Sequence, residues 1–434
     1  MKIWKKAIVL LAALVLSAGV LGGCKADKPP EGEKEPPLVT VERPTEEETR
    51  AKAMVKAIFD NYAVSGGSGE NEYINVKEYH NTTQSGFLWS NFSAAGMQYY
   101  MCKLYPEDNE QKETFRKMIN NFKYFRQSNP AANSAADSVK YHSGRGSEVN
   151  GGHGDCFFDD NIWVARNFLR AYELFGDEWY LEEAKRVNNW VLWGWNDDLK
   201  GIVWSEVGLT DGATEQHLER GLSANACGIM VNAMLSELAE NAEEKAYYFE
   251  WAEKFYDFCK IMQNKPESYD YWNGIHTVIE NGVRKNGGVN RVHYAYNSGS
   301  MILADLLMYD LETDQTKKAE YMDDAVGTSA AAKKTFNLLD PGASKFYYTG
   351  DPWFACILNE AYYELRLYKP EEARKYMESF NKNATAAYLN RDPVTKLFPY
   401  QATKKFTWEQ NASWVIHQVG VAEQAVLCAL YSIE

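Results

Sequence analysis

A helical hairpin that recurs along the chain constrains the fold more than any other feature. Apolar residues repeat about every 3.6 positions after Thr45, and few segments show the alternation of strands. Thr45 and Glu48 form a capping-box pattern at the start of the first helix. We predict twelve helices, over residues 45–63, 88–104, 109–127, 159–176, 178–194, 215–241, 243–263, 293–311, 316–337, 351–367, 369–388 and 409–431.

The predicted helices form pairs whose two members differ in character. One member is apolar and rich in small residues, as in residues 223–228, and the other carries a charged face, as in residues 182–186. A helix that is apolar all round lies inside a protein, whereas a helix with one charged stripe lies at the surface. A similar short turn joins the members of several pairs, which indicates a repeated unit. Six inner and six outer helices predict an all-α fold, an (α/α)6 barrel.

The loops between the pairs indicate which end of the barrel carries the function. Turns within a pair are short, but connections from an outer helix to the next inner helix are long and rich in Gly, Asn, Tyr and Trp. Loops longer than about 12–15 residues in a compact domain are usually functional or disordered. All of them lead into the first turns of inner helices, so we expect them to meet at one end. They cover residues 64–87, 128–158, 195–214, 264–292, 338–350 and 389–408.

The first 44 residues are predicted to direct export and not to fold. Lys2, Lys5 and Lys6 precede an apolar run over residues 8–20, which is too short to span a bilayer comfortably. The run ends in a Leu-Gly-Gly-Cys sequence that resembles a bacterial lipobox, which implies cleavage after residue 23 and lipidation of Cys24. The alternative is an ordinary signal peptide with an unmodified Cys.

The domain organisation follows from this leader. Residues 24–44 are rich in Pro and charge and predict a tether, so residues 45–434 form the predicted barrel domain. We therefore expect an exported monomer in a bacterial cell envelope, at the cell surface or in the periplasm, that contacts the membrane only through its lipid.

The net charge and the cysteine pattern argue against a nucleic-acid-binding protein and against a zinc site. The formal net charge is −14, and no basic run occurs beyond the first few residues, which argues against nucleic acid as a partner. Six Cys remain after Cys24, mostly within predicted helices, and we interpret them as free buried thiols, with disulfides as the alternative. No spacing resembles a zinc site, so the sequence predicts no metal and no cofactor.

Asp159 and Asp160 are the residues most suggestive of chemistry. They lie between Phe158 and Trp163, where the longest loop enters an inner helix. Glycoside cleavage uses two carboxyl groups, and retaining enzymes hold them about 5–5.5 Å apart. A helix N-terminus favours an ionised carboxylate, while repulsion and burial favour a protonated neighbour. The alternative is an N-cap beside a solvated first-turn residue.

Residues 157–165 and 169–177 resemble the core motif of glycoside hydrolase family 76, the bacterial endo-α-1,6-mannanases and their fungal relatives. The resemblance implies an (α/α)6 barrel and a retaining mechanism, with Asp159 as nucleophile and Asp160 as general acid/base. Residues 201–204, 222–225 and 294–299 are similar to later family segments, although Val203 and Ser298 depart from the family pattern.

Four further residues near these segments are predicted to bind substrate. Trp204 stacks on a sugar ring or packs against the barrel wall, and Tyr296 belongs to the core or to the cleft. Asn225 and Asn297 contact sugar hydroxyls, or else act as helix caps or polar core residues.

The predicted function is a surface-tethered retaining endo-α-1,6-mannanase acting on α-mannan or manno-oligosaccharides. Three alternatives stay open. An unsaturated glucuronyl hydrolase would share the barrel and use the basic loop residues Arg145, Arg284, Lys285 and Arg291. A transglycosylase would transfer the sugar to another glycan, and a non-catalytic lipoprotein would only bind glycans.

Overall fold

The computed structural model describes residues 43–127, 137–147, 149–210, 213–214, 217–337, 348, 350–398 and 414–434. The predicted signal peptide, Cys24 and the tether up to residue 42 lie outside this part of the chain. Within it, none of the helices combines the length and the apolar character that a membrane span requires.

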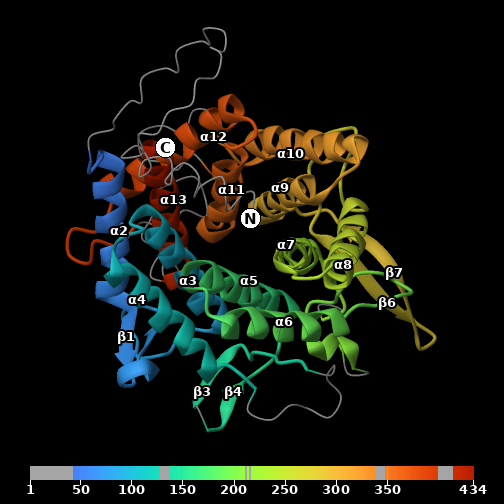
Figure 1. Ribbon diagram of the computed structural model, residues 1–434, viewed down its shortest axis with the longest axis horizontal. Helices are drawn as coiled ribbons and strands as arrows, with labels where there is room; N and C mark the ends of the chain where they lie inside the picture. Colours follow the sequence, from blue (N-terminus) through green and yellow to red (C-terminus); the bar gives the residue numbers. More distant parts are fainter. Residues whose placement is uncertain are drawn as a thin grey trace, which may run out of the picture.

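Among the described residues, six helices form a closed inner ring (Figure 1). Each inner helix packs against the next, and the last packs against the first. The inner helices are α3 (Leu88–Leu104), α5 (Phe158–Phe175), α7 (Leu222–Leu238), α9 (Ala295–Leu311), α11 (Pro352–Leu365) and α13 (Val415–Ile433).

In the part of the chain that the structure describes, six helices surround that ring, each packed against an inner helix. They are α2 (Glu46–Tyr62), α4 (Asn109–Asn120), α6 (Glu178–Trp193), α8 (Ala242–Lys260), α10 (Gln315–Phe336) and α12 (Pro370–Leu389). The predicted (α/α)6 barrel is therefore confirmed, and the inner and outer assignments are correct. The capping box predicted at Thr45 is also present, because its side chain accepts a hydrogen bond from the Glu48 backbone.

Most predicted helices match within about three residues, and two differ more; the predicted helix start at residue 409 lies outside the described residues. The helix predicted over residues 109–127 ends at Asn120 and continues as a 3₁₀ turn, Asn121–Tyr124. The helix predicted from residue 215 begins only at Leu222, because Arg220 and Gly221 form a short strand. Further 3₁₀ turns cover Gly69–Asn71 and Glu206–Leu209.

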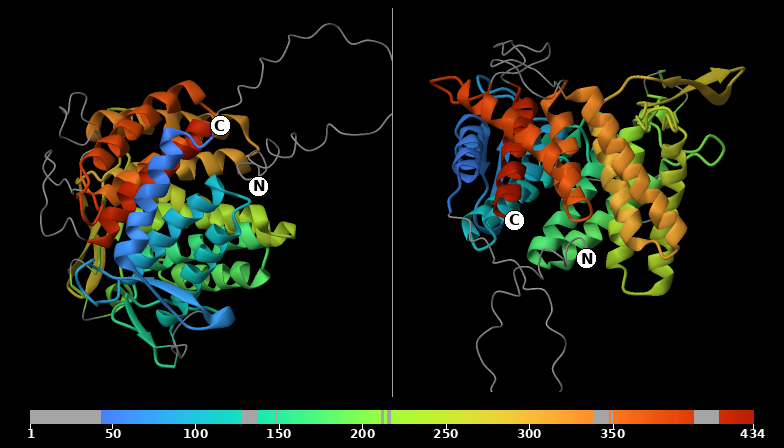
Figure 2. Two further views of the ribbon diagram at one scale, coloured as in Figure 1. Left: turned by 90° about the vertical axis from the view of Figure 1, so that its left-hand side faces the viewer. Right: turned by 90° about the horizontal axis from the view of Figure 1, so that it is seen from above.

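The long loops contain strands that the sequence did not predict. Two antiparallel hairpins pair β1 (Ala63–Gly66) with β2 (Tyr73–Val76), and β3 (Gly144–Ser147) with β4 (Gly151–His153). A third sheet orders β5 (Arg220–Gly221), β6 (Gly274–Glu280) and β7 (Val283–Asn290). The β6–β7 hairpin projects from the barrel (Figure 2), and its Asn281-Gly282 turn has positive φ at both residues.

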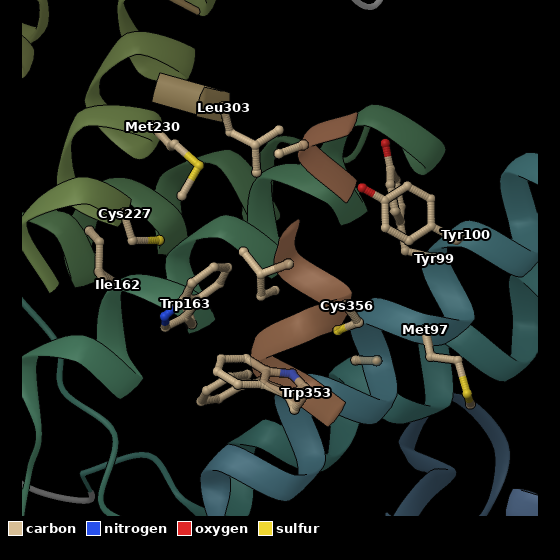
Figure 3. Packing of buried hydrophobic residues seen from close by; sticks show 14 of the residues in the cluster. Met97, Tyr99, Tyr100, Ile162, Trp163, Cys227, Met230, Leu303, Trp353 and Cys356 are labelled. Carbon is tan, nitrogen blue, oxygen red and sulfur yellow. The ribbon is translucent and has the colours of Figure 1, made fainter. Parts of the chain in front are cut away.

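The barrel interior is packed with aromatic, sulfur-containing and aliphatic side chains (Figure 3). Trp163 of α5 meets Trp353 of α11 edge to face, with ring centroids 5.6 Å apart. The six Cys of the described residues are buried and free, as the sequence predicted. The starts of α5, α7 and α9 lie at one end of this core, next to the described loop segments that carry Trp204 and Asn273.

Candidate active site

The first turn of α5 exposes backbone donors that a side-chain cap would normally satisfy. Phe157 occupies the N-cap position and makes no side-chain capping bond, whereas most outer helices are capped by Thr, Asp or Asn. Asp159 Oδ1 instead accepts a hydrogen bond from the backbone N–H of Asp160, at 2.9 Å. The free N–H groups and the helix dipole favour negative charge at this position.

An extended segment over residues 202–205 runs beside this helix start, with an isolated β-bridge between Ser205 and Phe157. The backbone N–H of Phe158 donates to the Trp204 carbonyl at 2.9 Å, and the Trp204 N–H donates to the Glu219 carbonyl at 2.9 Å. Trp204 thereby lies against Phe157, with ring centroids 4.7 Å apart, and its side chain hydrogen-bonds Asp159. The backbone therefore fixes Trp204 next to the first carboxylate.

These elements enclose a pocket of about 180 Å³ at the loop end of the barrel. It combines the starts of α5, α7 and α9 with the β5–β6 edge. Its lining residues are Asp159, Trp204, Glu219, Gly221, Ser223, Ala224, Asn273 and Tyr296. A larger hollow of about 940 Å³ lies on the outer wall by α4 and α6, and contains none of the predicted site residues.

The two adjacent aspartates have unequal acidities. Partial burial raises the pKa of Asp159 to about 6, a rise limited by the hydrogen bonds from the Asp160 backbone and the Trp204 side chain. Burial and the negative charge of Asp159 hold the pKa of Asp160 well above its usual range. Near neutral pH the geometry therefore favours one proton on the pair, held by Asp160.

Of the four predicted substrate-binding residues, Trp204 and Tyr296 reach the pocket. Tyr296 packs on Phe354, with ring centroids 4.2 Å apart, and its hydroxyl donates to Asn273 Oδ1 at 3.3 Å. Burial and the charge of Asp159 raise the pKa of Tyr296, so its hydroxyl stays protonated. The side chains of Trp204 and Tyr296 therefore both line the pocket that contains Asp159.

Asn225 does not line the pocket, which corrects the predicted sugar contact. The side chain is fully buried and hydrogen-bonds the backbone only. Its Oδ1 accepts from the Ile202 N–H at 3.0 Å, and its Nδ2 donates to the carbonyls of Gly221 and Ile202. Asn225 thus fastens the segment that carries Trp204 to the start of α7, which is the polar core role that the sequence left open.

Asn297 is also fully buried and lies outside the pocket lining. Its Nδ2 donates to Asn273 Oδ1 at 3.1 Å, while its Oδ1 has no partner in the described part of the protein. The residue therefore supports Asn273, which itself faces the pocket.

Sequence reasoning missed Glu219, Ser223 and Asn273 as pocket residues. Asn273 and Glu219 are far apart in sequence and meet only because β5 pairs with β6, in a sheet that was not predicted. The Asn281-Gly282 pair between alternating residues is a hairpin signal that would have predicted β6 and β7.

Comparison with known proteins places these features in a family. The model of glycosyl hydrolase family 76 matches residues 71–431. No curated protein sequence matches the chain significantly.

Solved structures share the fold at low sequence identity. The GH76 α-mannanase BT2949 of Bacteroides thetaiotaomicron is 18% identical, with 89% of this chain and 96% of that chain covered and a TM-score of 0.70. The GH76 mannosidase Bt3792 of the same species is 18% identical, with 89% and 99% covered and a TM-score of 0.72.

An α-1,6-mannanase of Salegentibacter sp. HEL1_6 is also similar. Its structure is an inactive variant with two consecutive Asp changed to Asn, in complex with α-1,6-mannotriose. It is 19% identical, with 88% of this chain and 99% of that chain covered and a TM-score of 0.62. The match of the family model over most of the chain confirms the resemblance of the Asp159 segment, and the protein belongs to glycoside hydrolase family 76.

Proposed function

We propose that the protein is a retaining, endo-acting α-1,6-mannanase. The observation that carries the proposal is the unequal acidity of Asp159 and Asp160 at a pocket lined by Trp204 and Tyr296. A retaining glycosidase needs one ionised carboxylate and one protonated carboxyl near the same bond. The inactive double Asp variant of the Salegentibacter α-1,6-mannanase, bound to α-1,6-mannotriose, supports the same pair and the same linkage.

In the proposed mechanism, Asp159 attacks the anomeric carbon while Asp160 protonates the departing glycosidic oxygen. This step forms a covalent glycosyl-enzyme and leaves Asp160 ionised. Asp160 then removes a proton from water, whose oxygen attacks the same carbon and releases Asp159. The hydrogen bonds that Asp159 accepts from the Asp160 backbone and from Trp204 keep it ionised and oriented for the first step.

We propose that Trp204 and Tyr296 hold the sugar ring beside Asp159. Each offers an apolar ring next to a polar group, and such surfaces suit the mixed faces of a pyranose. The ring of Trp204 is partly exposed, and it packs near the rings of Phe157 and His217.

We also propose that export and lipidation at Cys24 tether the enzyme to a bacterial envelope. The observations behind this step are the apolar run over residues 8–20 and the lipobox-like residues 21–24. Metabolic labelling of the expressed full-length chain with a fatty-acid analogue tests it. A labelled wild type and an unlabelled Cys24→Ala variant are expected, whereas equal labelling of both would contradict lipidation at this residue.

Incubation with linear α-1,6-mannan tests the enzymatic proposal. The wild type is expected to release short oligosaccharides of several lengths, as an endo-acting enzyme does, and Asp159→Asn is expected to release none. Binding without cleavage would favour a glycan-binding lipoprotein. With α-1,6-manno-oligosaccharides as substrate, products longer than the starting oligosaccharide would favour a transglycosylase. Cleavage of unsaturated glucuronyl oligosaccharides but not of mannan would favour the uronyl hydrolase.

A further inference from the structure

Glu219 places a second carboxylate beside Asp159 in the lining of the pocket. It lies directly before β5, and its side chain retains 18% of its possible solvent exposure. Its backbone carbonyl accepts the hydrogen bond from Trp204, so the residue is fixed to the same wall as the stacking ring. Neither the two-carboxylate mechanism nor the packing of the barrel accounts for a carboxylate at this position.

The protein uses the two oxygens of Glu219 differently. Oε1 accepts hydrogen bonds from Asn273 Nδ2 at 2.8 Å and from Asn290 Nδ2 at 2.9 Å. Oε2 accepts no hydrogen bond from the described residues, and His276 Nδ1, 3.5 Å away, forms an ion pair with it only when the imidazole is protonated. The carboxylate is therefore oriented through one oxygen, while the other remains available as an acceptor.

The wall that carries Glu219 is anchored by the next residue, Arg220. Its fully buried guanidinium donates to the carbonyls of Leu199 and Lys200 and to the side chains of Thr277 and Asn286. It thus joins β5, β6 and β7 to the loop before Trp204. Glu219 therefore belongs to a preorganised surface, as a recognition group requires.

We propose that Glu219 is a specificity-determining residue whose Oε2 accepts hydrogen bonds from hydroxyl groups of the sugar bound beside Asp159. The inference rests on the proposed function, because it assumes that a glycan occupies this pocket. A hydrogen bond from a hydroxyl to a carboxylate is roughly twice as strong as one between neutral groups. A carboxylate that is already oriented loses little conformational entropy when it forms such a hydrogen bond.

The charge of Glu219 also predicts which sugars are rejected. The described residues that line the pocket include two carboxylates, Asp159 and Glu219, and no Lys or Arg. An anionic sugar placed there would meet like charge without a compensating cation. The pocket therefore selects neutral, hydroxyl-rich sugars, and the uronyl hydrolase alternative is disfavoured by Glu219 itself.

Glu219→Gln provides a sharp test, because the new side chain keeps an oxygen for Asn273 and Asn290 and loses only the acceptor at Oε2. We expect kcat/KM on α-1,6-mannotetraose to fall about tenfold to a hundredfold, as for loss of a charged hydrogen bond to substrate. Glu280→Gln is the matched control, since Glu280 is exposed at the far end of β6 and pairs only with Lys285 among the described residues. It should retain wild-type kinetics and the same melting temperature.

Deoxy substrates separate recognition from a structural role. Mannotetraose analogues lacking a 2-, 3- or 4-hydroxyl should include at least one on which wild type and Glu219→Gln have equal kcat/KM. Wild-type kinetics in Glu219→Gln, or the same loss on every analogue, would overturn the inference while leaving the mannanase proposal intact. Failure of the wild type to cleave any mannan would instead overturn the proposed function, and the inference with it.

Discussion

Two buried carboxyl sites lie beside α5. The pKa values of Asp159 and Asp160 are raised at one site, and the pKa of Glu360 is lowered at the other. At the loop end, Asp159 and Asp160 have no ion pair with Lys or Arg in the described chain, and their pKa values are raised. Deeper in the barrel, Glu360 of α11 accepts hydrogen bonds from Arg166 and Arg170 of α5. These two cations lower the pKa of Glu360 to about 2, although burial alone would raise it.

The comparison shows that the neighbouring charge, not burial by itself, decides whether a carboxyl stabilises the fold or remains reactive. Glu423 lies in the same deep cluster as Glu360, and its pKa is shifted in the opposite direction. Burial and the charge of Glu360 raise its pKa to about 8, because Glu360 already neutralises part of the arginine charge. The deep cluster thus compensates the charge of Glu360 but not that of Glu423, whereas neither Asp159 nor Asp160 pairs with a Lys or Arg in the described chain.

The largest expected effect comes from removing either carboxyl of the reactive pair. Asp159→Asn should lower kcat on α-1,6-mannan by at least about 10⁴-fold, and Asp160→Asn by about 10²–10⁴-fold, with initial rates as the measurement. Both variants should also unfold at higher temperature than the wild type, because each removes an uncompensated carboxyl. For Asp159→Asn the gain should be on the order of 1–2 kcal/mol, less than a pKa of about 6 implies, since the side chain keeps some solvent contact. Wild-type activity in Asp159→Asn would contradict the catalytic role proposed for this carboxylate.

Removing the compensated carboxyl should have the opposite effect on stability. Glu360→Gln leaves Arg166 and Arg170 buried without their carboxylate, and should lower the free energy of unfolding by about 3–5 kcal/mol in denaturant titrations. Glu364→Gln is the control from the same helix, because burial raises the pKa of Glu364 to about 6 and its loss should leave stability equal or slightly higher. A stable Glu360→Gln variant would show that the deep cluster is not held by this pair.

The two regions should also differ in pH dependence. Glu360 has a lowered pKa, so its contribution to stability is complete above pH 4.5 and is lost as the pH falls toward about 2. Asp159 has a raised pKa, so the folded state binds more protons between pH 3.8 and about 6, and its contribution weakens as the pH rises through that window. Unfolding free energies measured against pH for the wild type, Asp159→Asn and Glu360→Gln should separate these slopes. Parallel curves for all three proteins would refute the assignment.

The smallest expected effect concerns the hydrogen bond that tunes Asp159. The acid limb of kcat/KM should have its midpoint near pH 6, where Asp159 becomes ionised. Trp204→Phe keeps an aromatic ring but removes the indole N–H, so this limb should move to higher pH by less than about one unit. The pH–rate profile measures the shift. An unmoved limb would mean that the Trp204 donor does not influence the nucleophile.

The barrel was predictable because inner and outer helices differ in their own sequences. The small apolar residues of α7 predict a buried helix, and the charged face of α6 predicts a helix at the surface. Capping residues such as Thr45 indicate where helices begin. The carboxyl pair was predictable because both members are adjacent in sequence.

The remainder of the site depends on distant contacts. The side chain of Glu219 is oriented by hydrogen bonds from Asn273 and Asn290. These residues lie near it only because β5, β6 and β7 form a sheet. Asn225 was expected at the sugar because it begins an inner helix at the right end. Its orientation toward the Ile202 backbone follows from the path of a loop, which local sequence does not encode.

The configuration of the first product tests the central claim most directly. In the proposed mechanism ionised Asp159 forms a covalent bond, and Asp160 acts first as an acid and then as a base, so the configuration at the anomeric carbon is inverted twice. Proton NMR during the first minutes of α-1,6-mannan hydrolysis should therefore show α-configured reducing ends before mutarotation. Initial release of the β-anomer would mean a single displacement by water, and would contradict the roles given to both aspartates.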